Sequence, residues 1–183
     1  RAVSLKDNSL ARLEGMKSES HQKGFLAVRM LLQEAGYTDY DLYYDEFGKP
    51  HLNDGRNISI SHSYDFSVIM LSDKNVGIDL ELRRDLIKKI ARKFAEEPFV
   101  FECENNSEEY VSKLTVIWGV KEAVFKVRNE IGISFKDHIF VRPFEMNQLK
   151  TTALLDFIDS KQDFEVHFTE IENYTLVWLW ESN

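Results

Sequence analysis

The sequence predicts an α+β fold built from two related halves. A helix-like segment followed by several strand-like segments occurs twice along the chain, and the change falls near residues 82–85. The chain has 183 residues, which is enough for one large domain or for two small halves that share a core. Its 43% hydrophobic and 13% aromatic residues supply the side chains for such a core. We therefore expect an N-terminal half at 1–82 and a C-terminal half at 83–183.

The expected N-terminal half starts with a helix and continues with strands. Apolar residues recur at near-helical spacing from Phe25 to Leu32, and Gly36 follows as a stop, so a helix is predicted at 18–35. Short apolar runs bounded by turn residues predict strands at 41–44, 57–61, 67–71 and 76–82. The sequences at 47–50 and 72–75 are typical of turns.

The expected C-terminal half repeats this order. A helix is predicted at 85–95 and ends near Pro98, because proline disfavours helix continuation. A longer helix is predicted within 107–129, where most apolar residues fall on one side. Strand-like segments follow at 139–141, 153–157, 164–169 and 174–180.

Composition excludes several classes of function. The formal net charge of −8 argues against general nucleic-acid binding. No apolar run approaches the roughly 20 residues that span a bilayer, and residues 1–10 lack the apolar core of a signal peptide. The sole cysteine, Cys103, cannot form an intramolecular disulfide, and its acidic neighbours disfavour a reactive thiolate. A cytoplasmic protein is expected.

Two carboxylates fall on one predicted strand. Asp79 and Glu81 are two residues apart and therefore share a face, whereas Ile78 and Leu80 point to the other. Parallel carboxylates repel each other unless a cation or a proton lies between them, and a hard cation such as Mg²⁺ accepts such oxygen ligands. The alternative is a solvent-exposed strand face with Arg or Lys nearby.

A second acid and a lysine fall on the predicted long helix. Glu122 and Lys126 are one turn apart and share a face. This is a common ion pair of little stabilising value, but it also suits a metal ligand or base beside a phosphate clamp.

A histidine lies between two hydroxyls at the end of a predicted strand. Ser61, His62 and Ser63 offer donors that suit phosphate oxygens, and the alternative is a turn with an exposed imidazole. No G-x-S-x-G elbow, H-E-x-x-H zinc motif, Walker A loop or G-x-G-x-x-G loop is present, so these common hydrolase, zinc and nucleotide sites are not supported.

These segments, in this order and spacing, resemble the 4'-phosphopantetheinyl transferase superfamily. The match is to the larger, monomeric type that activates peptide, polyketide and fatty-acid synthases. It rests on the segments Gly48–Leu52, Ile58–Ser63, Val76–Glu81 and Trp118–Lys126 and spans about residues 18–142. The GIDLE and WGVKEAVFK sequences are its specific part. Gly119 departs from the family pattern, which usually has Ser, Thr or another small residue there.

The resemblance implies two similar α+β halves, related by a pseudo-twofold axis, with coenzyme A bound in the cleft between them. It also implies a role for each matching residue. Asp79, Glu81 and Glu122 match the magnesium-binding acids, and Lys126 matches the lysine on the pyrophosphate. Ser61 and His62 match residues that hold coenzyme A phosphates, and Lys49 matches the residue near the adenine and the 3'-phosphate. Lys23 and Arg29 lie on the helix where the family often places basic residues for the 3'-phosphate.

The implied reaction transfers the phosphopantetheine arm of coenzyme A to a serine of an apo acyl or peptidyl carrier protein. The serine hydroxyl attacks the β-phosphorus and 3',5'-ADP leaves. Glu122 is expected to accept the serine proton, directly or through water. Mg²⁺ and Lys126 are expected to neutralise charge on the phosphates.

The partners implied are coenzyme A and an acidic carrier, and the basic segment 83–93 is a candidate docking patch for that carrier. A solvated helix face is the alternative reading of this segment. A non-catalytic coenzyme A- or carrier-binding module is the alternative for the whole chain, and another magnesium-dependent phosphoryl-transfer enzyme also stays open.

Overall fold

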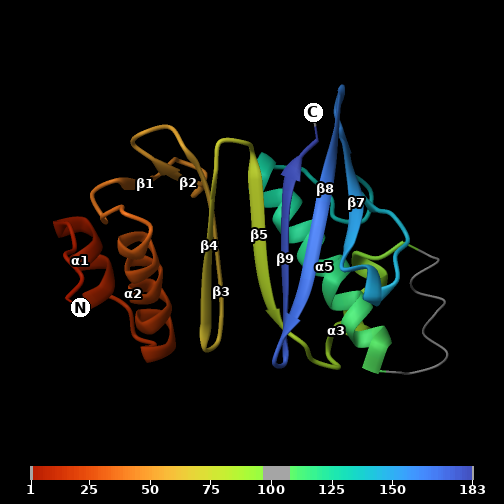
Figure 1. Cartoon of the computed structure of the whole chain (residues 1–183), viewed down its shortest axis with the longest axis horizontal. Helices are drawn as coiled ribbons and strands as arrows, with labels where there is room; N and C mark the ends of the chain where they lie inside the picture. Colours follow the sequence, from red (N-terminus) through yellow and green to blue (C-terminus); the bar gives the residue numbers. More distant parts are fainter. Residues whose placement is uncertain (1, 97–107, 183) are drawn as a thin grey trace.

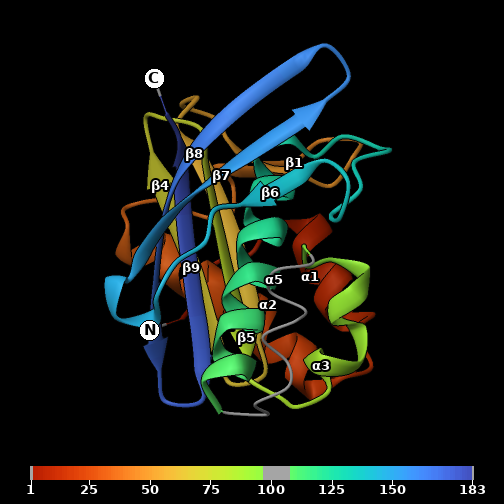
Figure 2. The same ribbon diagram turned by 90° about the vertical axis from the view of Figure 1, so that its right-hand side faces the viewer.

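The core of the fold is a five-stranded antiparallel sheet with one long helix against it. A computed structural model describes residues 2–96 and 108–182. The strands lie in the order β5-β9-β8-β7-β6 (Figure 1), and every neighbouring pair is antiparallel. Their bounds are β5 (Val76–Leu82), β6 (Ile139–Val141), β7 (Lys150–Phe157), β8 (Ser160–Ile171) and β9 (Tyr174–Glu181). Helix α5 (Glu108–Arg128) lies across one face of this sheet (Figure 2).

Close packing of α5 on β5 depends on a glycine. A Cβ atom on Gly77 would lie 2.1 Å from the carbonyl oxygen of Ala123, so only glycine permits this approach. Helix α5 also contributes fully buried residues to a core that it shares with the strands: Leu114, Val116, Ile117, Val120, Ala123 and Val124. The helix and β5 are therefore held at a short, fixed separation.

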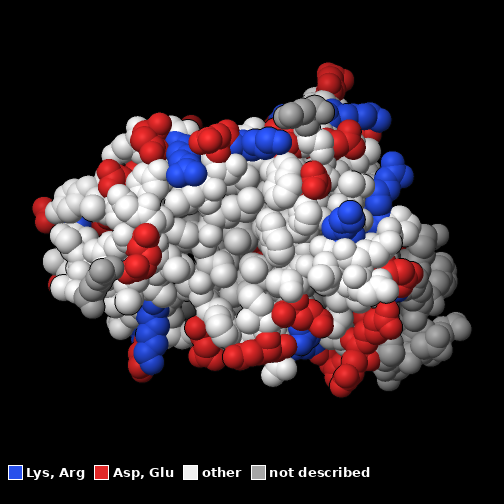
Figure 3. All heavy atoms as spheres, in the orientation of Figure 1, with Lys and Arg blue, Asp and Glu red and all other residues white. Residues whose placement is uncertain are grey.

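The N-terminal part has its own smaller core. It consists of α1 (Asp7–Glu14), α2 (Glu19–Glu34), the paired strands β1 (Leu42–Tyr44) and β2 (Pro50–Leu52), and the hairpin of β3 (Asn57–Ser63) and β4 (Phe66–Ser72). The buried side chains of this core are Val28, Leu32, Leu42, Leu52 and Ile58. Figure 3 shows the face over β4, β5 and β9, where charged side chains gather around the rim and few lie at the centre.

Two serine side chains join the N-terminal hairpin to the large sheet. The hydroxyl of Ser59 accepts a hydrogen bond from the Ile78 N–H at 3.0 Å, and that of Ser61 accepts one from the Leu80 N–H at 3.2 Å. These N–H groups belong to the edge of β5 that does not pair with β9. Side-chain oxygens thus take the place of a backbone ladder between β3 and β5.

Most of the expected elements are confirmed, with boundaries shifted by a few residues in most cases. The strands at 76–82 and 139–141 have the predicted ends, and the helix at 18–35 is α2. The helix at 85–95 is confirmed only as α3 (Ile87–Ile90) and the 3-10 turn η1 (Ala91–Lys93). Figure 1 places α3 beside α5, where Ile87 and Ile90 pack on its core, so tertiary contacts set this segment more than helical periodicity does.

Two short elements were not predicted, α1 and β2; a further 3-10 turn, η3 (Met146–Gln148), precedes β7. The turn-like sequence at 47–50 leads directly into β2, which pairs with β1 so that His51 lies opposite Tyr43. A three-residue strand is too short to show alternation in its sequence.

The expected division at residue 82 stays a prediction, although β5, which precedes it, pairs with β9 of the C-terminal part. Cys103 lies outside the described residues. None of the helices in the described ranges is long and apolar enough to cross a membrane.

Candidate active site

Asp79 and Lys126 meet between β5 and α5. The Lys126 ammonium donates to Asp79 Oδ1 at 2.7 Å and to the Ile78 carbonyl at 2.9 Å. Asp79 is 4% exposed, and its Oδ1 also accepts a hydrogen bond from the Ser61 hydroxyl at 3.1 Å. Its second oxygen, Oδ2, is buried and has no hydrogen-bond partner among the described residues. A buried carboxylate oxygen without a donor is costly, and such sites often bind an ion or take part in chemistry.

Gly119 lies beside that oxygen and packs closely on Val177. A Cβ atom at this position would lie 3.6 Å from Asp79 Oδ2, an ordinary contact, but 2.8 Å from Val177 Cγ2. The close approach of α5 to Val177 of β9 therefore favours glycine here.

The other two acids crowd the same site. Burial raises the pKa of Glu122 to about 7, and the nearby charges of Asp79 and Glu81 act in the same direction, while Lys126 opposes them. Burial and Asp79 also raise the pKa of Glu81. The charges of Asp79 and Lys126 act on the pKa of both Glu81 and Glu122, so the four residues lie within electrostatic reach of one another.

The three carboxylates suit a hard divalent cation by their chemistry. The unpartnered Oδ2 of Asp79 is a free ligand atom, and a cation would relieve the repulsion that raises the pKa values of Glu81 and Glu122. As the side chains stand, no group of three acids, histidines or cysteines in the described part of the chain converges closely enough to hold a metal ion. The predicted magnesium ligands thus have the right chemistry and lie near one another, and their role stays a prediction.

The tryptophan of the helix motif orients one of the acids. The Trp118 indole N–H donates to Glu81 Oε1 at 3.1 Å, and its ring packs at 5.1 Å from the ring of Phe94 and 5.4 Å from that of Phe135. Trp118 belongs to the WGVKEAVFK motif, but no separate role was predicted for it. Trp118 and Glu81 are 37 residues apart in the sequence, so their contact can be found only from the fold.

The other lysine of the motif faces away from the acids. Lys121 is fully buried, and its ammonium donates to Glu96 Oε1 at 3.1 Å and to the carbonyls of Phe135 and Ile139. It is therefore a structural residue that ties β6 and the preceding loop to α5.

His62 lies at a pocket formed by α1, α2 and β3. The pocket has a volume of about 300 Å³, and the basic side chains that line it are Arg12, His21, Arg29 and His62. A Cβ atom on Gly24 of α2 would lie 3.2 Å from the His62 ring, so the imidazole rests directly on this glycine. Burial lowers the pKa of His62, and the charges of His21 and Lys126 add to this. The pocket can offer several donors to an anion, and sequence reasoning missed Arg12 and His21.

Lys49 connects the N-terminal strands to the end of α5. Its ammonium donates to the Val127 carbonyl, and burial lowers its pKa, opposed by Asp45. It borders a pocket of about 210 Å³ that also touches Gly48, Pro50, Lys126 and Asn129. The Gly48-Lys49-Pro50 segment and Lys126 thus line the same cavity.

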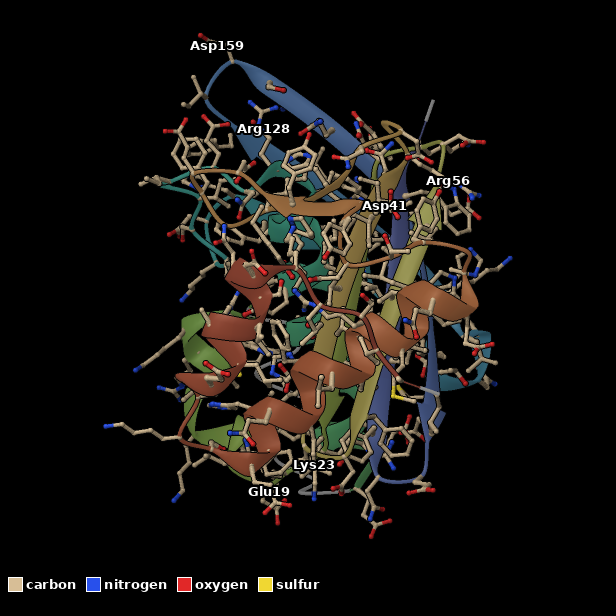
Figure 4. The ribbon with its side chains drawn as sticks, turned by 90° about the vertical axis from the view of Figure 1, so that its left-hand side faces the viewer. Glu19, Lys23, Asp41, Arg56, Arg128 and Asp159 are labelled. Carbon is tan, nitrogen blue, oxygen red and sulfur yellow. The ribbon has the colours of Figure 1, made fainter. Side chains whose placement is uncertain are left out.

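The two weaker 3'-phosphate candidates are engaged elsewhere. Lys23 points to solvent and pairs with Glu19 at 2.7 Å, as Figure 4 shows at the outer end of α2. Arg29 borders the His62 pocket, but its guanidinium is 4% exposed and pairs with Asp39 at 3.0 Å. Their role in phosphate binding stays a prediction.

The basic segment 83–93 is only partly free. Arg83 donates to the carbonyls of Glu172 and Tyr174 and pairs with Glu170, and Lys88 pairs with Asp85. A pocket of about 640 Å³ lies along this segment and begins at Leu82. Its lining mixes acids and bases, and it does not touch the acids of the site itself.

Comparison with known proteins agrees with the geometry. The family model of the 4'-phosphopantetheinyl transferase superfamily matches residues 75–178, which is more than half of the chain. The chain is 31% identical over 128 residues to the 4'-phosphopantetheinyl transferase gsp of Aneurinibacillus migulanus, and the match covers 69% of this chain. It covers 52% of that relative, so the chain spans about half the length of the curated protein it matches. The chain belongs to the 4'-phosphopantetheinyl transferase superfamily.

Proposed function

We propose that this protein transfers the 4'-phosphopantetheine arm of coenzyme A to a serine of an apo carrier protein, with Mg²⁺ as its cofactor. The observation that supports this most strongly is the site at Asp79. Lys126 and an unpartnered carboxylate oxygen lie together there, beside two acids with raised pKa values. This combination suits a pyrophosphate and its counter-ion.

Coenzyme A would lie along the surface between the N-terminal part and α5. The 3'-phosphate suits the His62 pocket, where Arg12 and His21 supply further donors. The adenine suits the cavity beside Gly48, Lys49 and Pro50, which also touches Lys126. This placement would bring the pyrophosphate to the Lys126 ammonium.

Transfer requires one bond to form and one to break at the β-phosphorus. The carrier serine oxygen attacks it, and the bond to the oxygen of 3',5'-ADP breaks. Glu122 would accept the serine proton, directly or through water, since it lies within electrostatic reach of Lys126 in the same site. Lys126 would stabilise negative charge on the phosphate oxygens.

Asp79, Glu81 and Glu122 would hold the divalent cation. When bound, Mg²⁺ supplies positive charge that neutralises the phosphate oxygens and orients them. The protein contributes chiefly position and electrostatics, since phosphoryl-type transfer needs little covalent participation by side chains.

The test is to incubate the protein with coenzyme A, Mg²⁺ and several apo carrier proteins and to weigh each carrier by mass spectrometry. A mass gain of one phosphopantetheine arm that disappears with EDTA supports the proposal. Binding of coenzyme A with no transfer to any carrier would instead favour the non-catalytic module.

We further propose that the carrier docks on the free part of the basic segment. Lys89, Arg92 and Lys93 are exposed. Carriers of this family are expected to be acidic, and two net anions can associate where a local patch of opposite charge faces the partner. The three side chains lie on α3 and η1, which follow the strand of Asp79 and Glu81.

Reversing Lys89, Arg92 and Lys93 to Glu should raise the KM for the carrier and leave the KM for coenzyme A nearly unchanged. The matched control reverses three exposed lysines elsewhere, Lys74, Lys150 and Lys161. The wild-type KM should also rise with salt, since exposed charges are screened over about 10 Å at 0.1 M. Equal carrier kinetics in both reversed variants would place the docking site elsewhere.

We also infer that the two parts of the chain are related halves and that the enzyme acts as a monomer in the cytoplasm. Each part packs a helix against antiparallel strands, α2 with the β3–β4 hairpin and α5 with the large sheet. The sole cysteine is compatible with a reducing compartment.

A further inference from the structure

The Ser61 side chain has a different environment from the one that a phosphate-binding hydroxyl needs. It is 7% exposed, its oxygen accepts from the Leu80 N–H at 3.2 Å, and its hydroxyl donates to Asp79 Oδ1 at 3.1 Å. A serine hydroxyl has one proton to donate. Because phosphate oxygens are acceptors, Ser61 has no donor left for them while it is bonded to Asp79.

The bonds to Asp79 are distributed unequally between its two oxygens. Ser61 and Lys126 both donate to Oδ1, and Oδ2 receives nothing within the described part of the chain. Two donors on one oxygen fix the rotation of the carboxylate. They also leave the second oxygen, beside Gly119, with its lone pairs free.

We propose that Ser61 is a positioning residue that turns the Asp79 carboxylate so that Oδ2 is presented to the divalent cation. This inference rests on the proposed function, since it concerns the metal ligand of the same site. Partners behind a metal ligand fix its orientation, and their loss commonly weakens metal binding about 10- to 100-fold. His62, which follows Ser61, is the residue whose imidazole reaches the phosphate pocket.

The chain supplies a closely matched control in Ser59. Its hydroxyl accepts from the Ile78 N–H at 3.0 Å, as that of Ser61 accepts from Leu80, and it too is buried. Among residues 2–96 and 108–182, its hydroxyl makes no hydrogen bond to a carboxylate. Ser59→Ala and Ser61→Ala therefore remove equivalent links between β3 and β5, and only Ser61→Ala also removes the bond to Asp79.

The experiment measures binding of Mn²⁺, by electron paramagnetic resonance, to the wild-type protein and to both variants, together with their thermal unfolding. The midpoint temperature of unfolding should fall by a similar amount in Ser59→Ala and Ser61→Ala. Ser61→Ala should bind Mn²⁺ about 10- to 100-fold more weakly, whereas Ser59→Ala should bind it like the wild type. Ser61→Thr keeps the hydroxyl in a residue suited to strands and should restore most of the affinity.

Kinetics separate this role from phosphate binding. Ser61→Ala should need more Mg²⁺ and lower kcat, with a nearly unchanged KM for coenzyme A. Unchanged Mn²⁺ affinity with a raised KM for coenzyme A would overturn the proposal and make Ser61 a phosphate ligand. Equal weakening in Ser59→Ala would also overturn it, because the effect would then come from the contact between the strands.

Two results keep the proposal separate from the proposed function and from misfolding of a variant. Mn²⁺ titration needs no carrier, so a wild-type protein that binds Mn²⁺ but transfers no arm refutes the function and leaves the role of Ser61 standing. A crystal structure of the wild type with Mn²⁺ needs no variant. Asp79 should coordinate through Oδ2 with Oδ1 still bonded to Ser61, and coordination through Oδ1 or an absence of Mn²⁺ would refute the role.

Discussion

Two buried aspartates in different parts of this protein each pair with a cation, and the hydrogen-bonding capacity of the two carboxylates is filled to different degrees. Asp39 pairs with Arg29 at 3.0 Å, and Asp79 pairs with Lys126 at 2.7 Å. Both aspartates are almost fully buried. Asp39 accepts hydrogen bonds on both oxygens, with Lys6 N–H on Oδ2 and Arg29 on Oδ1. Asp79 has both its donors on Oδ1, and no donor in the described part of the chain reaches Oδ2.

The electrostatic surroundings differ in the same sense. Burial would raise the pKa of Asp39, but hydrogen bonds from Ser9, Lys6 and Arg29 outweigh it and lower the pKa. Around Asp79, by contrast, the acids Glu81 and Glu122 have raised pKa values. A buried ion pair whose hydrogen bonds are all made stabilises the fold. A group of acids with too few hydrogen-bond donors around it suits the binding of a cation or the transfer of a proton.

The largest expected effects differ between the two pairs: loss of the Asp39 charge should lower stability, and loss of the Asp79 charge should lower activity. Asp39→Asn should destabilise the protein by about 3–5 kcal/mol, because Arg29 is left buried without its counter-charge. Asp79→Asn should change stability by only about 1 kcal/mol, since the Lys126 side chain is 28% exposed and water can solvate its ammonium when the counter-charge is lost. Its transfer rate should fall by about 100-fold or more. Urea unfolding and the carrier assay measure both quantities.

A folded Asp79→Asn variant with wild-type turnover at saturating Mg²⁺ would refute the metal-ligand assignment. An Asp39→Asn variant as stable as the wild type would remove the contrast between the pairs.

The pH dependence of stability should report the crowded acids directly. The pKa of Glu122 is raised from 4.5 to about 7 on folding, so the folded state binds more protons than the unfolded state between these values. Stability in EDTA should therefore fall as the pH rises from about 4.5 to about 7. Glu122→Gln should flatten this part of the curve, and Mg²⁺ should stabilise the wild type more at pH 8 than at pH 5. Parallel curves for the two proteins would show that Glu122 titrates normally.

A smaller effect is expected at the His62 pocket, where Arg12 of α1 lines it. Arg12→Gln should weaken coenzyme A binding about 10-fold, which is typical of a charged hydrogen bond to an anion. Lys23→Gln should have little effect, because Lys23 is directed to solvent and paired with Glu19. Calorimetric titration also tests the cause: dephospho-coenzyme A should bind equally to wild type and Arg12→Gln. A larger loss in Lys23→Gln would restore the sequence-based assignment.

The smallest expected effect concerns Trp118. Trp118→Phe keeps the aromatic packing and removes only the N–H that bonds Glu81, so the Mg²⁺ requirement should rise about fivefold, as for loss of one hydrogen bond. Trp178→Phe is the matched control, since its ring stacks on His167 of the large sheet. If the control shifts the Mg²⁺ requirement equally, Trp118 has no special role at Glu81.

Long, periodic segments were predictable from the sequence, whereas short ones and relations between segments were not. The strand with Asp79 and Glu81 and the helix with Glu122 and Lys126 were found with their shared faces, since both depend on local periodicity. Helical spacing already singled out Lys126 as the lysine that shares a face with Glu122. Only the fold shows that Lys126 reaches Asp79 and that Lys121 is buried on β6.

The sequence alone determined the α+β class, the order of most elements and the superfamily, because periodicity and motif spacing are local properties of the chain. The tertiary structure decided which hydrogen-bond partner each side chain reaches. Arg29 is bonded to Asp39, and the hydroxyl of Ser61 lies on Asp79. Such partners lie 10 and 18 residues apart and are brought together by packing. A side chain can donate only a few hydrogen bonds, so its role depends on which acceptors the fold places beside it.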